Sequence, residues 1–318
     1  MFCRKFLFGE KACKKDIYEP ERGYGFVSEQ SFRVDVPRPG EYKVTVTLQA
    51  EQDLGKIFIF IGSGTPVFLG NISAGSFSRT LTVNVDDRIP VGQSCICEDR
   101  ALLITVAAPC SCLSSLSVKE AACPTIYIAG STEVTKEEQG DARPPQTTGG
   151  WQRMFTAYTN EKIAVSDHSR PGLTPDSFRR EGHYAAMGQY SRSGDFYFLQ
   201  FAYGEAENDY CRQLIRYIIE CRERLIYPVL FTPPVYGKIS MGEDSSVREK
   251  GADNACVWAC REVGRRTETP VIELHRLIWK DCDAYTAAGI VAREIARSCK
   301  SHPVRGYRFL ADCLTSVS

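Results

Sequence analysis

The sequence predicts an all-β domain followed by an α/β domain with a parallel sheet, and a change of pattern along the chain indicates this. Residues 31–106 hold short runs that alternate apolar and polar side chains between Gly, Pro, Asn and Asp. After Pro124, compact apolar runs alternate with helical periods, which is typical of a parallel sheet covered on both faces. The 318 residues are ample for two cores. We therefore expect domains at 1–121 and 122–318.

The strands of the first domain are expected where apolar residues recur at every second position. Such runs lie at 31–36, 42–48, 56–61, 79–85 and 101–106. Alternate side chains of a strand point to opposite faces, so each run offers one face to a core. Short strands of this kind, without a long helical period between them, predict an antiparallel β-sandwich.

The second domain is expected to alternate buried strands with amphipathic helices. The strands are expected at 125–129, 163–165, 196–201, 227–232 and 270–274, and the helices from about residue 209, at 252–264 and at 285–299. The polar stretch 133–148 predicts a long loop.

Composition argues against two classes of partner. Lys plus Arg and Asp plus Glu both total 39, so the formal net charge is zero and there is no general attraction to nucleic acid or an anionic membrane. Apolar residues make up 43% of the chain, yet no apolar run approaches the roughly 20 residues that span a bilayer. We expect neither a nucleic-acid nor a membrane partner.

Fourteen cysteines leave two alternatives for the compartment. The first residues carry a charge every few positions and lack the apolar core of a secretory signal. This favours a cytoplasmic protein with free thiols, whereas a secreted domain that has lost its leader would contain disulfides. No Cys-x-x-Cys pair is present, so we expect no metal site. The closely spaced pairs instead indicate small buried groups: Cys95 with Cys97, Cys110 with Cys112, and Cys256 with Cys260.

Four polar or glycine-containing segments follow strands of the second domain. Residues 130–132 follow the first strand, Gly172 lies in the loop after the second, 203–205 follow the third, and 281–289 follow the last. Ligands of such sheets bind beyond the carboxyl ends of the strands. The four segments are therefore expected to converge on one site.

These segments resemble the site blocks of the SGNH (GDSL-like) hydrolase superfamily, specifically its rhamnogalacturonan acetylesterase-like carbohydrate esterases. Residues 129–132, Ala-Gly-Ser-Thr, resemble the family's Gly-Asp-Ser-Thr without the aspartate. Gly150-Trp151-Gln152 resembles a Trp-Gly-Gln segment, and 202–205 resemble a Gly-His-Asn-Asp block. Gly172 resembles the family's glycine block, and Asp281 begins a segment that resembles its Asp-x-x-His block.

The resemblance covers nearly the whole chain and implies both fold and activity. Residues 21–26 and the β-region after them resemble the amino-terminal, galactose-binding-like sandwich of many bacterial members. The implied fold is an all-β sandwich followed by a flavodoxin-like three-layer α/β/α SGNH domain. The implied activity is the deacetylation of plant cell-wall oligosaccharides by serine attack on an acetyl ester, without a metal or other cofactor. The implied ligand is a carbohydrate or a small acyl ester, and the oligomeric state is not indicated.

The catalytic residues of the family carry over incompletely. The nucleophile falls on Ser131 if one residue is deleted, and on Thr132 without a gap. Asp281 matches the aspartate that orients the base, and could equally be a helix N-cap. The base position three residues later is Ala284, whose methyl group accepts no proton. General-base catalysis commonly contributes about 10²–10⁴ in rate.

The oxyanion hole and pocket are also altered. The backbone N–H groups of Ser131 and Gly172 could remain as donors, but the asparagine position falls on Gly204, and one such donor is worth roughly 10²–10³. Tyr203 precedes Gly204 in the same segment and is expected to line the pocket. Gly172 and Gly130 could also serve only tight turns.

Two further residues of the pocket remain open. Trp151 is either a sugar platform or a packing residue. Of the four histidines, His168, just before Gly172, is the candidate replacement base. The others, His183, His275 and His302, are expected to be structural.

Three functions follow as alternatives. The chain is a pseudoenzyme that binds a carbohydrate-like ligand or scaffolds an active partner, because the His, the Asn and a clear Gly-Asp-Ser are absent. Alternatively it is an active serine esterase with a rearranged base. A third alternative is an interaction module that uses residues 1–121.

Overall fold

The computed structural model describes residues 1–9, 12–62, 65–87, 89, 95, 100–109, 112–131, 150–170, 172–201, 207–233, 252–277 and 284–314. The chain forms two compact units. One comprises Met1–Asp87, Cys97–Thr125 and Thr156–Ser166, and the other comprises Arg88–Ile96, Ile126–Phe155 and Asp167–Ser318. The division between residues 121 and 122 stays a prediction.

The first unit contains two antiparallel sheets, with a short helix, α1, at Ala12–Lys15. One sheet has the order β1-β9-β4-β7, formed by Cys3–Leu7, Leu113–Glu120, Gly40–Ala50 and Gly75–Val85. The other has the order β2-β3-β8-β5-β6, formed by Tyr24–Phe26, Ser31–Asp35, Ala101–Val106, Leu54–Ile61 and Thr65–Ile72.

The alternating sequence pattern gives each sheet of this unit one buried face. In β4, Val44, Val46 and Leu48 are buried, while the residues between them are half-buried. Leu102 and Ile104 of β8 belong to the same hydrophobic cluster as these β4 residues. The two sheets thus share one core, which is the arrangement of a β-sandwich.

A parallel sheet of order β11-β10-β12-β13-β14 has most of its residues in the second unit. Its strands are Ala164–Asp167, Thr125–Gly130, Phe196–Gln200, Tyr227–Phe231 and Val271–Ile272. All residues of β10 and β12 are buried, because a sheet covered on both faces requires apolar side chains on both.

The helices that accompany this sheet follow the chain in order. They are α2 Trp151–Met154, continued by a 3-10 turn at Phe155–Tyr158, α3 Pro175–Arg180, α4 His183–Tyr190, α5 Glu207–Glu223, α6 Ala252–Thr267, α7 Leu274–Leu277, α8 Ala284–Lys300 and α9 Arg305–Cys313. None of the described helices is long and apolar enough to cross a membrane.

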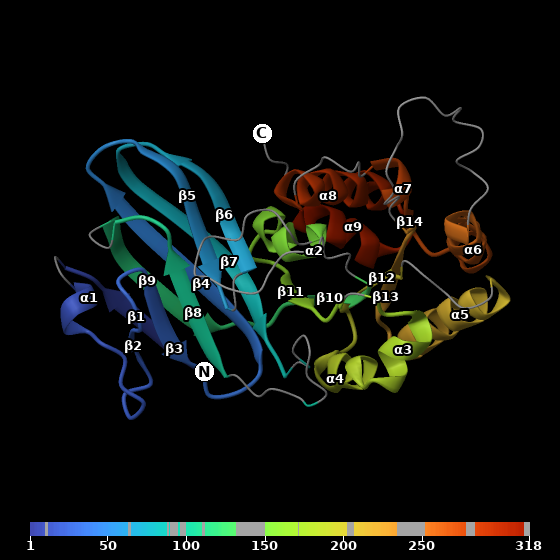
Figure 1. Cartoon of the computed structure of the whole chain (residues 1–318), viewed down its shortest axis with the longest axis horizontal. Helices are drawn as coiled ribbons and strands as arrows, with labels where there is room; N and C mark the ends of the chain where they lie inside the picture. Colours follow the sequence, from blue (N-terminus) through green and yellow to red (C-terminus); the bar gives the residue numbers. More distant parts are fainter. Residues whose placement is uncertain are drawn as a thin grey trace. The chain divides into compact units, whose positions relative to one another are not determined.

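The helices cover both faces of the sheet (Figure 1). On one face, Leu199 of β12 and Leu230 of β13 share a core with Leu214 of α5. On the other face, Trp151 of α2 stacks on Phe231 with ring centroids 5.2 Å apart. These contacts confirm the predicted three-layer α/β/α architecture.

Several cysteines belong to the helical part of this core. Burial raises the pKa of Cys221 and of Cys299 to about 12, and it raises the pKa of Cys260 further. These thiols remain protonated at neutral pH and pack as small apolar groups. Cys97 and Cys110, members of the predicted Cys-x-Cys pairs, lie outside the described residues.

Candidate functional site

The candidate site begins where β10 ends. Gly130 has φ +135°, and a Cβ at this position would lie 1.5 Å from the carbonyl oxygen of Gln200 on β12. Only glycine allows the two strands to approach this closely. Gly130 therefore fixes the position of the residue that follows it, Ser131.

Ser131 extends the sheet by one residue. Its backbone N–H donates to the carbonyl oxygen of Gln200 at 2.8 Å, and it forms a parallel bridge with Arg170. The residue is 1% exposed. The Ser131 N–H, which was expected to serve as an oxyanion donor, is thus bonded to β12, because Ser131 continues the hydrogen-bonding pattern of the sheet.

The glycine loop meets Ser131 as the sequence predicted. The backbone N–H of Gly172 donates to Oγ of Ser131 at 3.2 Å. Gly172 has φ +75°, and a Cβ there would meet no atom within 4 Å. Glycine is therefore favoured here by the left-handed backbone conformation and not by lack of space. The second expected oxyanion donor therefore points at the Ser131 hydroxyl.

A glutamine network supports this end of the sheet. Oε1 of Gln200 accepts hydrogen bonds from Nε1 of Trp151 at 2.9 Å and from Nε2 of Gln152 at 2.8 Å. Nε2 of Gln200 donates to the carbonyl oxygen of Ser131 at 3.4 Å. Gln200 was not among the site residues predicted from the sequence. A polar residue at the end of an otherwise apolar strand is the feature that could have indicated it. Trp151 is 2% exposed, so it packs in the core and offers no ring face to solvent.

His168 lies beside β10 but is not directly opposite Ser131. The backbone N–H of His168 donates to the carbonyl oxygen of Ile128 at 2.9 Å, and that of Arg170 donates to Gly130 at 3.0 Å. Arg170 is thus the residue paired with Ser131, and His168 lies two residues earlier, about 7 Å along the strand direction. The His168 side chain is buried, with its ring centroid 6.0 Å from that of Tyr127.

A second buried histidine lies close to this group. His183 begins α4, is 5% exposed, and its ring stacks on Phe178 with a centroid distance of 5.5 Å. Burial, and then electrostatic interaction with Arg170 and His168, lower the pKa of His183 to about 4. The imidazole is therefore neutral at pH 7 and a weak base. Sequence reasoning classed it as structural, because its approach to Arg170 depends on the tertiary fold.

The remaining candidates are Ala284 and four residues outside the described ranges. Ala284, which the resemblance aligns with the family's base position, is the first residue of α8. Thr132, Tyr203, Gly204 and Asp281 lie outside the described residues. The structure thus brings together Gly130, Ser131, Gly172 and, through Gln200, Trp151.

Two curated proteins match part of the chain. No protein-family model matches it. Over 115 residues it is 24% identical to rhamnogalacturonan acetylesterase RhgT of Bacillus subtilis (strain 168), covering 34% of this chain and 47% of the relative. Over 119 residues it is 27% identical to the probable rhamnogalacturonan acetylesterase YesY of the same organism, covering 34% and 52%. The chain spans about half the length of the curated relatives it matches.

A solved structure matches over nearly the full length. The crystal structure of protein YxiM of Bacillus subtilis aligns with a TM-score of 0.50 and 18% identity, covering 95% of this chain and 100% of the other. The two proteins share their fold. Together, this shared fold and the partial matches to two acetylesterases support an SGNH-like hydrolase fold for the chain.

Proposed function

We propose that this chain is a carbohydrate acetylesterase homologue that has lost efficient esterase activity and binds an acylated carbohydrate at the carboxyl ends of β10 and β12. The observation that carries this proposal is the environment of Ser131. Its N–H is bonded to Gln200, its Oγ accepts from Gly172, and it is 1% exposed.

Attack on an ester requires an accessible hydroxyl, a base and at least one N–H that is free to bind the developing oxyanion. Ser131 supplies none of these in its present position, because its hydroxyl is buried and occupies the Gly172 N–H. Ser131 is thus a structural residue that joins β10 to the glycine loop. The nucleophile position of the family then falls on Thr132.

Among the described residues, the two histidines near the site are poorly suited to activate Thr132. The family's base position is Ala284, and a methyl group accepts no proton. His183 has a pKa of about 4, so at pH 7 it has little affinity for a proton. His168 is buried beside β10, with its ring next to Tyr127. These observations support a binding role over turnover.

The ligand class follows from the relatives. The two matched proteins are named rhamnogalacturonan acetylesterase and probable rhamnogalacturonan acetylesterase. A member that keeps the fold and the converging loops but not the base retains the means to bind an acetylated carbohydrate. An acetylated oligosaccharide is therefore the expected ligand.

Hydrolysis of p-nitrophenyl acetate and acetylated xylan tests the loss of activity. We expect the parent protein to be no faster than its Thr132→Ala variant, and the double variant Ala284→His, Gly204→Asn to gain about 10² or more in rate. Calorimetry with acetylated and deacetylated xylo-oligosaccharides tests binding, with the acetylated form expected to bind more tightly. A parent rate abolished by Ser131→Ala or Thr132→Ala would contradict the proposal.

An active esterase with a rearranged base is the second candidate, and the position of His168 favours it. His168 lies beside β10, two residues before Arg170, which pairs with Ser131. This candidate requires the imidazole of His168 to move toward the Ser131 hydroxyl. In that case His168→Ala would abolish a measurable parent rate while His183→Ala would not. Equal rates for the parent and His168→Ala would exclude this candidate.

A further inference from the structure

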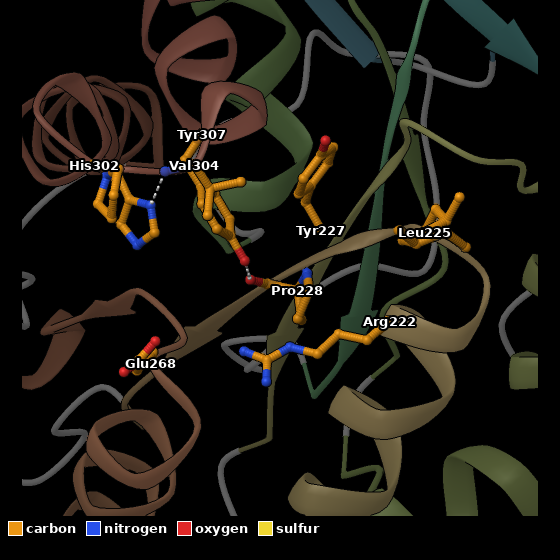
Figure 2. A pocket seen from close by; sticks show the side chains of 10 residues that line it. Arg222, Leu225, Tyr227, Pro228, Glu268, His302, Val304 and Tyr307 are labelled. Atoms are coloured by element: carbon orange, nitrogen blue, oxygen red, sulfur yellow. Dashed lines mark hydrogen bonds between the residues drawn. The ribbon is translucent and has the colours of Figure 1, made fainter.

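A pocket of about 630 Å³ lies near the amino-terminal ends of the parallel strands, whereas Ser131 lies at their carboxyl ends (Figure 2). Tyr227, in its wall, begins β13, whereas Ser131 follows the end of β10, and both strands run parallel to β12. Because the strands are about five residues long, their two ends are about 15 Å apart. The volume is within the range of small-molecule sites, about 300–1,000 Å³.

Two helices end at this pocket in an unusual conformation. Leu225 follows α5 with φ 56°, and Glu268 follows α6 with φ 50°; among the described residues these are the non-glycine residues with positive φ. The N–H of Ile226 bonds to Cys221, and that of Thr269 bonds to Gly264, as in helix ends that normally carry glycine. Both positions line the pocket, so each keeps a side chain there at a steric cost that glycine would avoid.

Apolar side chains are exposed at the same place. Leu225 is 67% exposed and Val304 is 42% exposed, and both line the pocket. The wall behind them is fixed, because Oη of Tyr307 donates to the carbonyl oxygen of Pro228 at 2.7 Å. A Cβ on Gly306 would lie 2.3 Å from the Tyr227 ring, so glycine lets α9 pack against this strand. The pocket is therefore preformed.

Hydrogen-bonding groups lie toward the other side of the pocket. Figure 2 shows the guanidinium of Arg222, the carboxylate of Glu268 and the imidazole of His302 on the side away from Leu225. Nδ1 of His302 accepts from the N–H of Val304 at 3.2 Å, and burial and the charge of Arg308 lower the pKa of His302. The neutral imidazole therefore carries its proton on Nε2. The pocket offers a cationic fork, a neutral donor and an anionic acceptor.

We propose that this pocket binds a hydroxylated carboxylate of sugar size, a uronate unit, independently of the site at Ser131. Nη2 of Arg222 already donates to the carbonyl oxygen of Thr267 and to Oγ1 of Thr269, which holds the guanidinium in place. The other N–H groups of this planar cation match the carboxylate of such a ligand. The Glu268 carboxylate accepts from its hydroxyls, and the His302 imidazole donates to them. Leu225 covers the apolar C–H face of the sugar ring, whereas Val304 lies beside His302 on the other side of the pocket (Figure 2).

Titration of the full chain, labelled at Leu and Val methyl groups, with sodium galacturonate tests this proposal. Galactose with matched sodium chloride is the control ligand. We expect saturable shifts at the Leu225 and Val304 methyl groups with galacturonate, and at least tenfold weaker binding of galactose. Shifts that do not saturate, equal binding of the two sugars, or shifts confined to the residues around Ser131 would overturn the proposal.

Variants separate binding from folding. Leu225→Gly is expected to weaken galacturonate binding at least fivefold while raising the melting temperature, because it removes both the contact and the backbone strain. Arg222→Gln is expected to weaken binding at least tenfold. The control Glu223→Gln changes an exposed neighbour that does not line the pocket and should bind like the parent, as should Ser131→Ala. Unchanged binding by Leu225→Gly and Arg222→Gln would overturn the proposal.

Discussion

The backbone N–H of Gly172 donates a hydrogen bond to Oγ of Ser131 at 3.2 Å, and this contact joins the glycine loop to the end of β10. The residues are 41 positions apart in the chain. In a working serine esterase the same two groups, a hydroxyl and a loop N–H, would both contact the substrate. Here they contact each other, which supports the structural role proposed for Ser131.

Replacement of Ser131 by Ala should lower stability without lowering esterase activity. The Gly172 N–H would lose its acceptor in a buried setting, which costs about 1–2 kcal/mol. Urea denaturation measures the free energy of unfolding, and p-nitrophenyl acetate hydrolysis measures activity. Ser131→Thr, which keeps a hydroxyl, is the comparison that tests whether the hydrogen bond is the cause.

Two glycines of the site should respond very differently to alanine. Gly130→Ala places a Cβ 1.5 Å from a backbone carbonyl oxygen, so we expect a loss of about 3 kcal/mol or more, or failure to fold. Gly172→Ala meets open space and carries only the cost of its left-handed backbone, about 1 kcal/mol. Similar melting temperatures for the two variants would contradict the described approach of β10 to β12.

Removal of the Gln200 side-chain amide should destabilise the core around α2. Gln200→Leu would leave Nε1 of Trp151 and Nε2 of Gln152 without their acceptor, at a cost of about 2–4 kcal/mol. Gln200→Glu keeps an acceptor for both donors and should cost less, although it adds a buried charge. Thermal unfolding, followed by Trp fluorescence, compares the two variants.

Stability should fall in mild acid because of His183. Its pKa is about 4 in the folded chain and near 6.5 when unfolded, so below pH 6.5 the unfolded state binds more protons. The contribution of the neutral imidazole is complete above about pH 6.5 and is lost as the pH falls toward 4, on the order of 2 kcal/mol. Denaturation of His183→Gln across this range should show a smaller pH dependence than the parent. An identical pH profile would contradict a buried neutral His183.

Replacement of Arg179 by lysine should lower the stability of the fold. Its guanidinium lies 4.1 Å from the ring centroid of Tyr184 and 3.9 Å from that of Tyr217, and it pairs with Glu220 at 3.0 Å. A lysine cannot stack on two rings with a planar group, so Arg179→Lys should cost about 1–2 kcal/mol. Arg180→Ala, an exposed arginine of the same helix, is the control and should change stability by less than about 0.5 kcal/mol.

Local patterns predicted much of the fold. The alternating runs at 42–48 and 101–106 are β4 and β8, and the buried runs at 196–201 and 227–232 are β12 and β13, because burial on one face or two leaves a direct trace in the sequence. The strand β9, Leu-Ser-Ser-Leu-Ser-Val-Lys-Glu, was not predicted. Its serines dilute the alternation, and its place between β1 and β4 is fixed by pairing with distant residues.

The candidate site, like the fold, could be predicted only in part from the sequence. The order of its glycine and serine segments was enough to predict the superfamily and that residues 130–131 meet Gly172. The partners of their polar groups were not predictable, because a hydrogen bond depends on strand register and loop position, which local sequence does not encode. Only the tertiary structure gives the Ser131 N–H to a carbonyl oxygen 69 residues away on β12, and so decides that this serine belongs to the sheet.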